Sequence, residues 1–254
     1  MFRAHTSIEL GWSTGAVSDP ERVCAENATI VIPTYNQAAR IVPLLERLSV
    51  ALPQTHVLVV DNCSQDGTQV RVSQYVKLKR AKVDLLERRG LTERSLCATL
   101  ADAAQHCGTA ALVLLPPQIE KPHTLTNKLL QGLATGAALS IPQRASAELS
   151  PQFDRIFRRL FKMKYQKFGL GQFDPFAMAL GFNTNKTRVL LRSLKALQPQ
   201  DDFVLLHLLS LLEPGTEISV VEHSERLKEL PRFSQQFEAF PKTAIGLCKL
   251  LARS

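Results

Sequence analysis

The sequence predicts an α/β fold in which a mostly parallel sheet is covered by helices on both faces. Three observations predict it. Short, continuous apolar segments recur through the first half of the chain, and segments with helical periodicity alternate with them. In addition, the chain has 254 residues, of which 45% are hydrophobic and 21% are charged. This length and composition are typical of a globular domain with a sizeable core. Continuously apolar strands are typical of parallel sheets buried on both faces. We therefore expect the functional crevice at the carboxyl ends of the strands.

The expected elements follow one another in order. Strands are expected at 28–33, 56–61, 82–86, 110–115 and 137–141. Helices are expected around 41–48, from the turn at 62–67 through Lys79, and at 93–106 and 124–133. Pro43 is compatible with the first of these helices if it lies in the first turn. The second half is less periodic, with a helix expected at 201–212, a strand at 218–221 and a helix at 241–253.

Composition excludes several classes of protein. No apolar run approaches the roughly 18 residues of a spanning helix, and the first residues lack the pattern of a signal peptide. The five cysteines never show a Cys-x-x-Cys spacing, so neither a zinc site nor a disulfide framework is expected, and a reducing cytoplasm fits best. A net charge of +8 favours anionic partners, but 6% aromatic residues and no recognised motif argue against nucleic acid. These features predict a cytoplasmic protein that can lie peripherally at a membrane.

Two segments at the ends of expected strands carry a family resemblance. Residues 30–36 read Ile-Val-Ile-Pro-Thr-Tyr-Asn, and residues 59–68 read Val-Val-Asp-Asn-Cys-Ser-Gln-Asp-Gly-Thr. Together they resemble the opening of family 2 glycosyltransferases, which have the GT-A fold, and the chain is most similar to the dolichol-phosphate mannose synthase branch. The resemblance covers about 28–141. It implies a single GT-A domain at 27–254, with a nucleotide-binding half at 27–142 and an acceptor half at 143–254. Residues 1–26 are polar and irregular, and we expect them to form an irregular arm.

The resemblance also implies a binding site for a nucleotide sugar, linked to UDP or GDP. Pro33, Tyr35 and Asn36 would shape the base pocket, Asp61 would contact the base or ribose, and Asp66 would close the loop behind it. Taken alone, Asp66 is better explained as a helix cap. The joint presence of both motifs favours the nucleotide site.

The family's Asp-x-Asp motif after the fourth strand, which holds a divalent metal ion, is replaced in this chain. Pro122 matches the family's following proline, so Pro116 and Gln118 stand where the two aspartates belong. Neither supplies an anionic oxygen for a hard cation. We therefore expect no metal cofactor, with Gln118, Arg144 and Arg155 as candidates to face the diphosphate.

Asp202 is the candidate catalytic residue. Asp201-Asp202-Phe203-Val204-Leu205 resembles a motif whose aspartate is the general base in members that use hydroxyl acceptors. The alternative is that these two acids offset the dipole of the helix that they begin.

A basic segment in the second half allows two interpretations. It contains Arg155, Arg158, Arg159 and Lys162 among phenylalanines at helical spacing and has no acid. It is either a helix at an anionic membrane surface or a domain helix whose phenylalanines face the core.

The resemblance implies transfer of a sugar from a nucleotide-sugar donor to an acceptor, with polyprenyl phosphate as the favoured acceptor and little or no metal dependence. The alternative hypothesis is a catalytically inactive relative that binds nucleotides or acts as a scaffold, because Pro116 and Gln118 replace the metal ligands.

Overall fold

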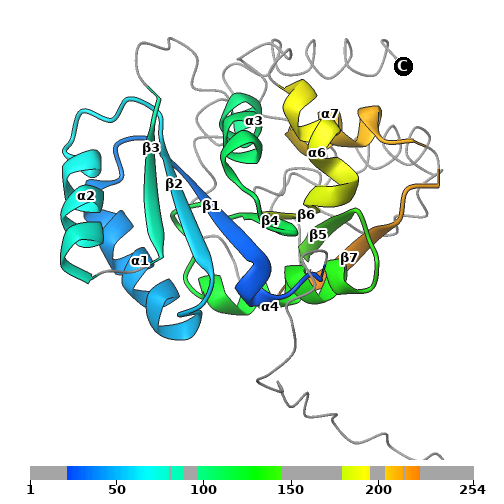
Figure 1. Cartoon of the computed structure of the whole chain (residues 1–254), viewed down its shortest axis with the longest axis horizontal. Helices are drawn as coiled ribbons and strands as arrows, with labels where there is room; N and C mark the ends of the chain where they lie inside the picture. The colour runs from blue at the N-terminus through cyan, green and yellow to red at the C-terminus, as the bar shows by residue number, and fades with distance from the viewer. Residues whose placement is uncertain are drawn as a thin grey trace, which may run out of the picture.

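A mixed sheet with helices on both faces forms the centre of the molecule in the computed structural model (Figure 1). The structure describes residues 22–79, 82–88, 96–144, 179–194, 204–213 and 215–223. The strands are β1 (Ala28–Thr34), β2 (His56–Asp61), β3 (Val83–Glu87), β4 (Ala111–Leu114), β5 (Leu139–Arg144), β6 (Leu180–Asn183) and β7 (Ile218–His223). The helices are the short 3-10 helix η1 (Ala25–Asn27), α1 (Ala38–Ala51), α2 (Thr68–Lys79), α3 (Leu96–His106), α4 (Pro122–Ala134), α6 (Thr184–Ser193) and α7 (Val204–Leu211).

Within this described part the strand order is β3-β2-β1-β4-β6-β5-β7. Strands β3, β2, β1 and β4 are parallel, β6 runs antiparallel between β4 and β5, and β7 pairs in parallel with β5. The register pairs Thr34 with Asp61 and Asp61 with Glu87. The carboxyl ends of these three strands therefore lie next to one another at one edge of the sheet.

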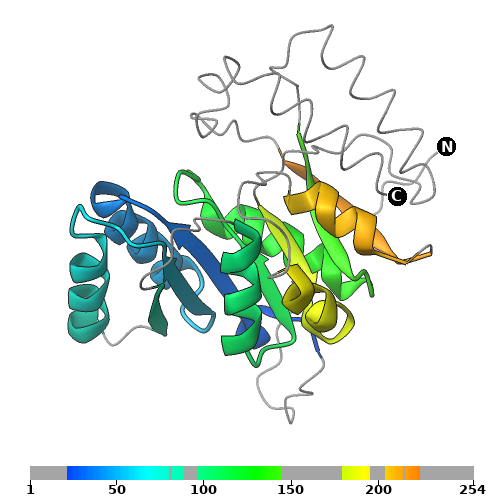
Figure 2. The same cartoon turned by 90° about the horizontal axis from the view of Figure 1, so that it is seen from above.

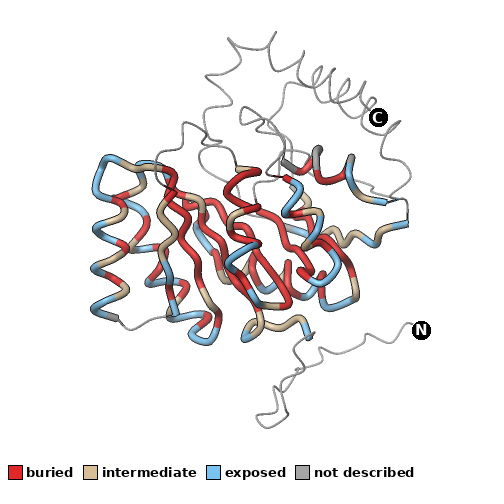
Figure 3. The backbone as a smooth tube through the Cα atoms, turned by 45° about the horizontal axis from the view of Figure 1, so that its top comes forward, coloured by how far each residue is buried: buried red, intermediate tan, exposed pale blue. Residues whose placement is uncertain are grey.

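The core has two layers because successive side chains in a strand point to opposite faces. Ile30 and Ile32 of β1 pack with α1, α2 and α4, whereas Val31 packs with α3, α6 and α7. The two sets of helices cover opposite faces, as Figure 2 shows from above. Figure 3 shows the strands buried in the centre and the outer faces of the helices exposed.

The predicted fold class is confirmed, and each strand and helix expected between 28 and 144 is present within a few residues of its expected bounds. Pro43 does not lie in the first turn of its helix, the position at which a proline costs little. Helix α1 begins at Ala38, so Pro43 lies beyond its first turn. Because proline has no N–H, Pro43 cannot donate the helical hydrogen bond to the Ala39 carbonyl. Both residues are exposed, so water can donate to that carbonyl instead.

Strand β6 and helix α6 were not expected from the sequence. β6 has only four residues, and Gly181 interrupts its apolar pattern. A Cβ at Gly181 would lie 3.3 Å from atoms of Leu129, Leu133 and Ser140, so the glycine allows α4 to pack closely against the sheet. Helix α6 follows at once, and the Asn183 side chain accepts from the backbone N–H groups of residues 185 and 186.

Of the arm expected at 1–26, residues 22–26 are described, and Val23 and Ala25 pack against the core. The helix expected at 241–253 and the basic segment at 155–162 lie outside the described residues. Among the described helices, none is long and apolar enough to cross a membrane.

Candidate functional site

The loops that follow β1 and β2 lie side by side and are hydrogen-bonded to each other. The backbone N–H of Asn36 donates to the Ser64 hydroxyl at 2.9 Å, and the backbone N–H of Gln65 donates to the Asn36 side-chain oxygen at 2.9 Å. Asn36 therefore uses both its main chain and its side chain to hold the second loop. The predicted neighbourhood of the two motifs is thus present at the carboxyl edge of the sheet.

A second pair of hydrogen bonds joins the same loops closer to the helices. The N–H of Gln37 donates to the Thr68 hydroxyl, and the N–H of Ala38 donates to the Asp66 carboxylate, both at 2.9 Å. We call Asn36, Gln37, Ala38, Ser64, Gln65, Asp66 and Thr68 the loop clamp.

Asp66 joins both helices that follow these loops. Partial desolvation raises its pKa, but hydrogen bonds from the Thr68 hydroxyl and from the N–H groups of Ala38 and Thr68 outweigh this effect and hold the pKa below its usual value. Asp66 thus fills the capping role considered from the sequence, but it also caps across the two loops.

The clamped loops contain residues with left-handed backbone conformations. Asn36 has φ 52°, Cys63 has φ 59° and Gly67 has φ 86°. A left-handed conformation is unfavourable for a residue with a Cβ, so Asn36 and Cys63 persist there because the surrounding hydrogen bonds fix them. Strained residues of this kind concentrate at binding sites.

Asp61 lies under the loops and is fully buried. Its Oδ1 accepts from the hydroxyls of Thr34 (2.9 Å) and Ser64, and its Oδ2 accepts from the N–H of Ser64 (2.9 Å) and from the Gln69 side chain (2.7 Å). These bonds use about the four acceptor positions that a carboxylate has. Asp61, expected to contact the base or ribose, is in this structure occupied in fixing the two loops.

Asn62, the next residue, connects β1 to α3. Its Nδ2 donates to the Thr34 carbonyl at 3.3 Å, and its Oδ1 accepts from Arg88 at 2.6 Å and from the Thr99 hydroxyl at 3.2 Å. Arg88 also pairs with Asp102 of α3 at 2.9 Å. Sequence reasoning missed Arg88, Thr99 and Asp102. The available signal was an arginine directly after an apolar strand.

The outer surface of the site is formed by residues of the first motif. Tyr35 is 37% exposed, Asn36 is exposed and Pro33 is half-buried. Tyr35 is therefore exposed beside the clamp, and Asn36 is exposed within it with its amide oxygen bonded to the Gln65 N–H.

The β4–α4 loop, which contains the predicted diphosphate-facing residue Gln118, is closely held. Pro116 is buried, Gln118 is half-buried and Glu120 is exposed. Arg47 of α1 donates to the carbonyls of Ile119 (3.3 Å) and Glu120 (3.1 Å). The side-chain oxygens that this loop offers to a cation are the Gln118 amide and the Glu120 carboxylate.

Other predicted residues are not brought into the site by the described structure. Arg155 and Asp202 lie outside the described residues, and only the backbone of Arg144 is described, at the end of β5. In the part of the chain that the structure describes, no three His, Cys, Asp or Glu side chains form a metal-binding group.

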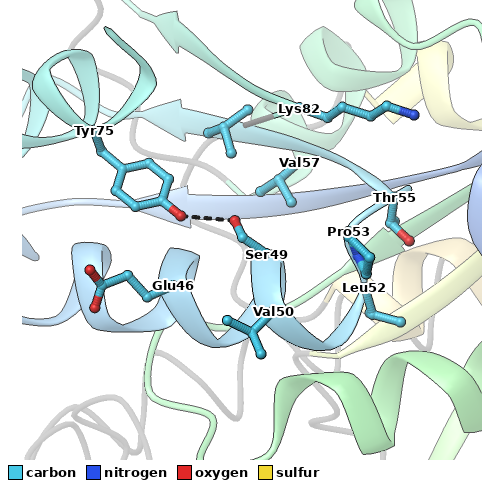
Figure 4. Close-up of a pocket in the computed structure, with 10 residues that line it drawn as sticks. Glu46, Ser49, Val50, Leu52, Pro53, Thr55, Val57, Tyr75 and Lys82 are labelled. Carbon is cyan, nitrogen blue, oxygen red and sulfur yellow. Dashed lines mark hydrogen bonds between the residues drawn. The ribbon is translucent and has the colours of Figure 1, made fainter. Parts of the chain in front are cut away.

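Two hollows lie at the opposite edge of the sheet. The first, of about 500 Å³, is at the amino ends of β2 and β3 and includes Ser49, Tyr75 and Lys82 among its lining residues (Figure 4). The second, of about 520 Å³, is at the amino ends of β5 and β7. Neither contacts the loop clamp, so neither belongs to the candidate site.

Comparisons with known proteins agree with this geometry. Residues 29–106 match the model of glycosyl transferase family 2. The chain is 31% identical over 134 residues to the polyprenol monophosphomannose synthase of Mycolicibacterium smegmatis, a match that covers 51% of this chain and 50% of that protein. The chain thus spans about half the length of the curated relative it matches.

Solved structures share the fold. Glucosyl-3-phosphoglycerate synthase from Mycobacterium tuberculosis, in complex with Mn²⁺ and uridine-diphosphate-glucose, has a TM-score of 0.66 at 17% identity, covering 95% of this chain and 86% of that one. A mannosyltransferase from Pyrobaculum calidifontis, in complex with GDP-Man and Mn²⁺, has a TM-score of 0.53 at 16% identity, covering 80% and 58%.

Residues 29–106 are thus similar to glycosyl transferase family 2, and the fold is that of the GT-A glycosyltransferases among the solved structures. The predicted resemblance to the polyprenyl-phosphate mannose synthase branch is confirmed by the Mycolicibacterium protein. The alternative of an inactive relative finds no support in these comparisons, because the matched proteins are synthases and transferases.

The expectation of no metal cofactor is wrong. Structures that share this fold hold Mn²⁺ together with UDP-glucose or GDP-mannose. The physical reason is that a divalent cation at a diphosphate takes many of its ligands from phosphate oxygens and water and needs only one or two protein carboxylates. Replacement of the two aspartates therefore does not exclude the ion, and the β4–α4 loop still carries the half-buried Gln118 amide and the exposed Glu120 carboxylate.

Proposed function

We propose that this chain transfers a sugar from a UDP- or GDP-linked donor to a polyprenyl phosphate, with a divalent cation at the donor diphosphate. The observation that carries the proposal is the loop clamp, which joins two strand ends into one surface beside Tyr35. The carboxyl edge of a parallel sheet is where α/β proteins bind nucleotides. The likeness to a polyprenol monophosphomannose synthase supports the acceptor class.

The nucleoside is held by the exposed part of the site. Pro33 and the Tyr35 ring offer a flat surface for the base, and the Asn36 amide offers polar atoms beside it. Asp61 fixes the loops from underneath, and the exposed Asp66 fixes them at the start of the two helices. This division of roles explains why a buried carboxylate lies below an exposed tyrosine.

Glu120 and Gln118 would hold the divalent cation, and Arg47 keeps their loop against α1. When bound, the ion offsets negative charge on the diphosphate as it leaves. In the transfer, the bond from the anomeric carbon to the diphosphate oxygen breaks with its electron pair on that oxygen. A bond from the anomeric carbon to an acceptor oxygen forms.

The acceptor class determines whether a general base is needed. A phosphate monoester has its second pKa at about 6, so near neutral pH its oxygen is already anionic and can attack directly. A hydroxyl acceptor must lose a proton, and Asp202 is the residue that the sequence proposes for that step.

The lipid acceptor also implies contact with a membrane surface. The basic segment containing Arg155, Arg158, Arg159 and Lys162 is the part of the sequence that we propose for this contact. Sedimentation with vesicles containing anionic or only zwitterionic lipid tests it. The proposal expects salt-sensitive binding to the anionic vesicles alone.

Transfer itself is tested with the purified chain, labelled GDP-mannose and UDP-glucose, Mn²⁺ and either polyprenyl phosphate or the matching polyprenol. We expect labelled lipid from one donor, only with the phosphate acceptor, and its loss when a chelator removes Mn²⁺. Tyr75→Phe at the opposite edge is the control variant and should keep activity. No lipid product from either donor would contradict the proposal.

A further inference from the structure

Arg88 is a buried cation at the carboxyl end of β3 that the proposed chemistry does not use. Its side chain is 4% exposed. Its Nη1 donates to the Asn62 side-chain oxygen at 2.6 Å, and its Nε donates to the Asp102 carboxylate at 2.9 Å. Arg88 therefore lies between the second loop of the clamp and helix α3.

The hydrogen bonds fix the orientation of the Asn62 amide. Arginine has only donors, so the atom of Asn62 that faces Arg88 must be the oxygen. The Thr99 hydroxyl donates to the same oxygen, which leaves the amide nitrogen to donate to the Thr34 carbonyl. Asn62 is thus held from α3 and β3 on one side and from β1 on the other.

The main chain of Arg88 holds the same loop. Its N–H donates to the Asp61 carbonyl at 3.0 Å, and its carbonyl accepts from the Cys63 thiol at 2.5 Å. Residues 61–63 are consecutive, and each is bonded to Arg88. Cys63 has the left-handed backbone of this loop, and Ser64 comes directly after it. Arg88 therefore contacts the loop just before the point where it joins Asn36.

We propose that Arg88 is a positioning residue for the nucleoside: acting through Asn62, it holds the β2 loop in the shape that binds the nucleotide. This inference rests on the proposed function. Loss of the guanidinium leaves the buried Asn62 oxygen with the Thr99 hydroxyl as its donor and removes the connection from the loop through Arg88 to Asp102 of α3. The nucleotide then binds to a loop that must first be ordered, so the loss falls on nucleotide affinity.

A double-mutant cycle tests whether Arg88 acts through Asn62. The variants are Arg88→Gln, Asn62→Ala and the double variant, with Kd for GDP and UDP measured by calorimetry in the presence of Mn²⁺. We expect Arg88→Gln to raise the Kd of the preferred nucleotide about tenfold in the wild-type background and less than about twofold in the Asn62→Ala background. An equal effect in both backgrounds would overturn the proposal.

Further readouts separate positioning from a general loss of structure. Arg88→Lys keeps a donor and should recover part of the affinity, and Arg88→Gln should raise the donor KM more than it lowers kcat. A lower kcat with unchanged nucleotide Kd would also overturn the proposal. Tyr75→Phe removes a hydroxyl bond at the opposite edge and should leave Kd unchanged.

If Arg88→Gln does not fold, Thr99→Val replaces it, since this near-isosteric change removes the other donor to the Asn62 oxygen. It should raise Kd a few-fold, and an unchanged Kd would overturn the proposal. A wild-type chain that binds neither nucleotide would defeat the proposed function first. If the wild type binds a nucleotide but the effects of Arg88→Gln and Asn62→Ala on Kd are additive, only the role proposed for Arg88 is contradicted.

Discussion

The Asn36 N–H donates to the Ser64 hydroxyl at 2.9 Å across 28 residues of sequence, and this bond joins the ends of two neighbouring strands. The same hydroxyl donates to the buried Asp61 carboxylate. One small side chain thus connects the exposed tip of the first loop to the carboxylate below both loops.

Ser64→Ala removes both hydroxyl bonds. We expect it to lower the free energy of unfolding by about 1–2 kcal/mol, because the Asn36 N–H and Asp61 lose a partner, and to raise the nucleotide Kd several-fold. Denaturant unfolding and calorimetry measure the two effects. Ser49→Ala is the matched control, since it removes a hydroxyl bond to Tyr75 far from the clamp and should affect stability alone.

Gly67→Ala tests the left-handed backbone before α2. Gly67 has φ 86° and open space around it, so the cost of a methyl group there is conformational. We expect a loss of about 1–2 kcal/mol in the free energy of unfolding. Gly108→Ala also meets open space but has no left-handed φ, and an equal loss in that variant would contradict this explanation.

The lowered pKa of Asp66 predicts a pH dependence. Because its pKa is lower in the folded than in the unfolded chain, where it is about 3.9, its contribution to stability is fully present above that value and is lost as the pH falls through the folded pKa. Asp66→Asn should therefore be less stable than wild type at neutral pH and equal to it at acid pH. Denaturant titrations across this range measure the difference, and a gap that persists in acid would contradict the prediction.

Glu120→Gln should weaken the binding of Mn²⁺. Removing the one carboxylate of the β4–α4 loop leaves two amide oxygens, which are poorer ligands for a hard cation. We expect a higher Mn²⁺ concentration for half-saturation, measured by electron paramagnetic resonance of free Mn²⁺ in the presence of the nucleotide. Glu46→Gln changes an exposed carboxylate at the opposite edge and should leave that concentration unchanged.

Asp202→Asn distinguishes the two acceptor classes. If the acceptor is a polyprenyl phosphate, kcat should fall by less than about tenfold, because the attacking oxygen is already anionic. A general base for a hydroxyl acceptor is worth about 10²–10⁴-fold, and a loss of that size would place a hydroxyl at the acceptor. Initial rates with labelled donor decide between them.

The strands of the first half could be predicted because each is a continuous apolar segment that ends at a turn. The neighbourhood of the Tyr35 and Asp61 loops followed from their positions at parallel strand ends. The sequence did not show that Asp61 would be occupied by Thr34, Ser64 and Gln69, because those bonds depend on side-chain directions across two strands.

Other features depend on tertiary contacts that no local pattern records. β6 is too short to give a periodic signal, and Gly181 interrupts it because α4 packs closely there. The bond between Arg88 and Asn62 joins residues 26 apart in sequence. The metal expectation was wrong because it counted only side-chain ligands and left out the oxygens that a diphosphate itself supplies.

The clamped loops beside Tyr35 are proposed to hold the nucleoside of the donor. Backbone amide chemical shifts of the labelled chain, titrated with GDP and UDP in the presence of Mn²⁺, test this proposal most directly. We expect the largest changes at residues 35–37 and 63–65, and we expect these changes to be lost in Ser64→Ala at the same nucleotide concentration. Changes confined to the opposite edge, around Ser49 and Lys82, would contradict it.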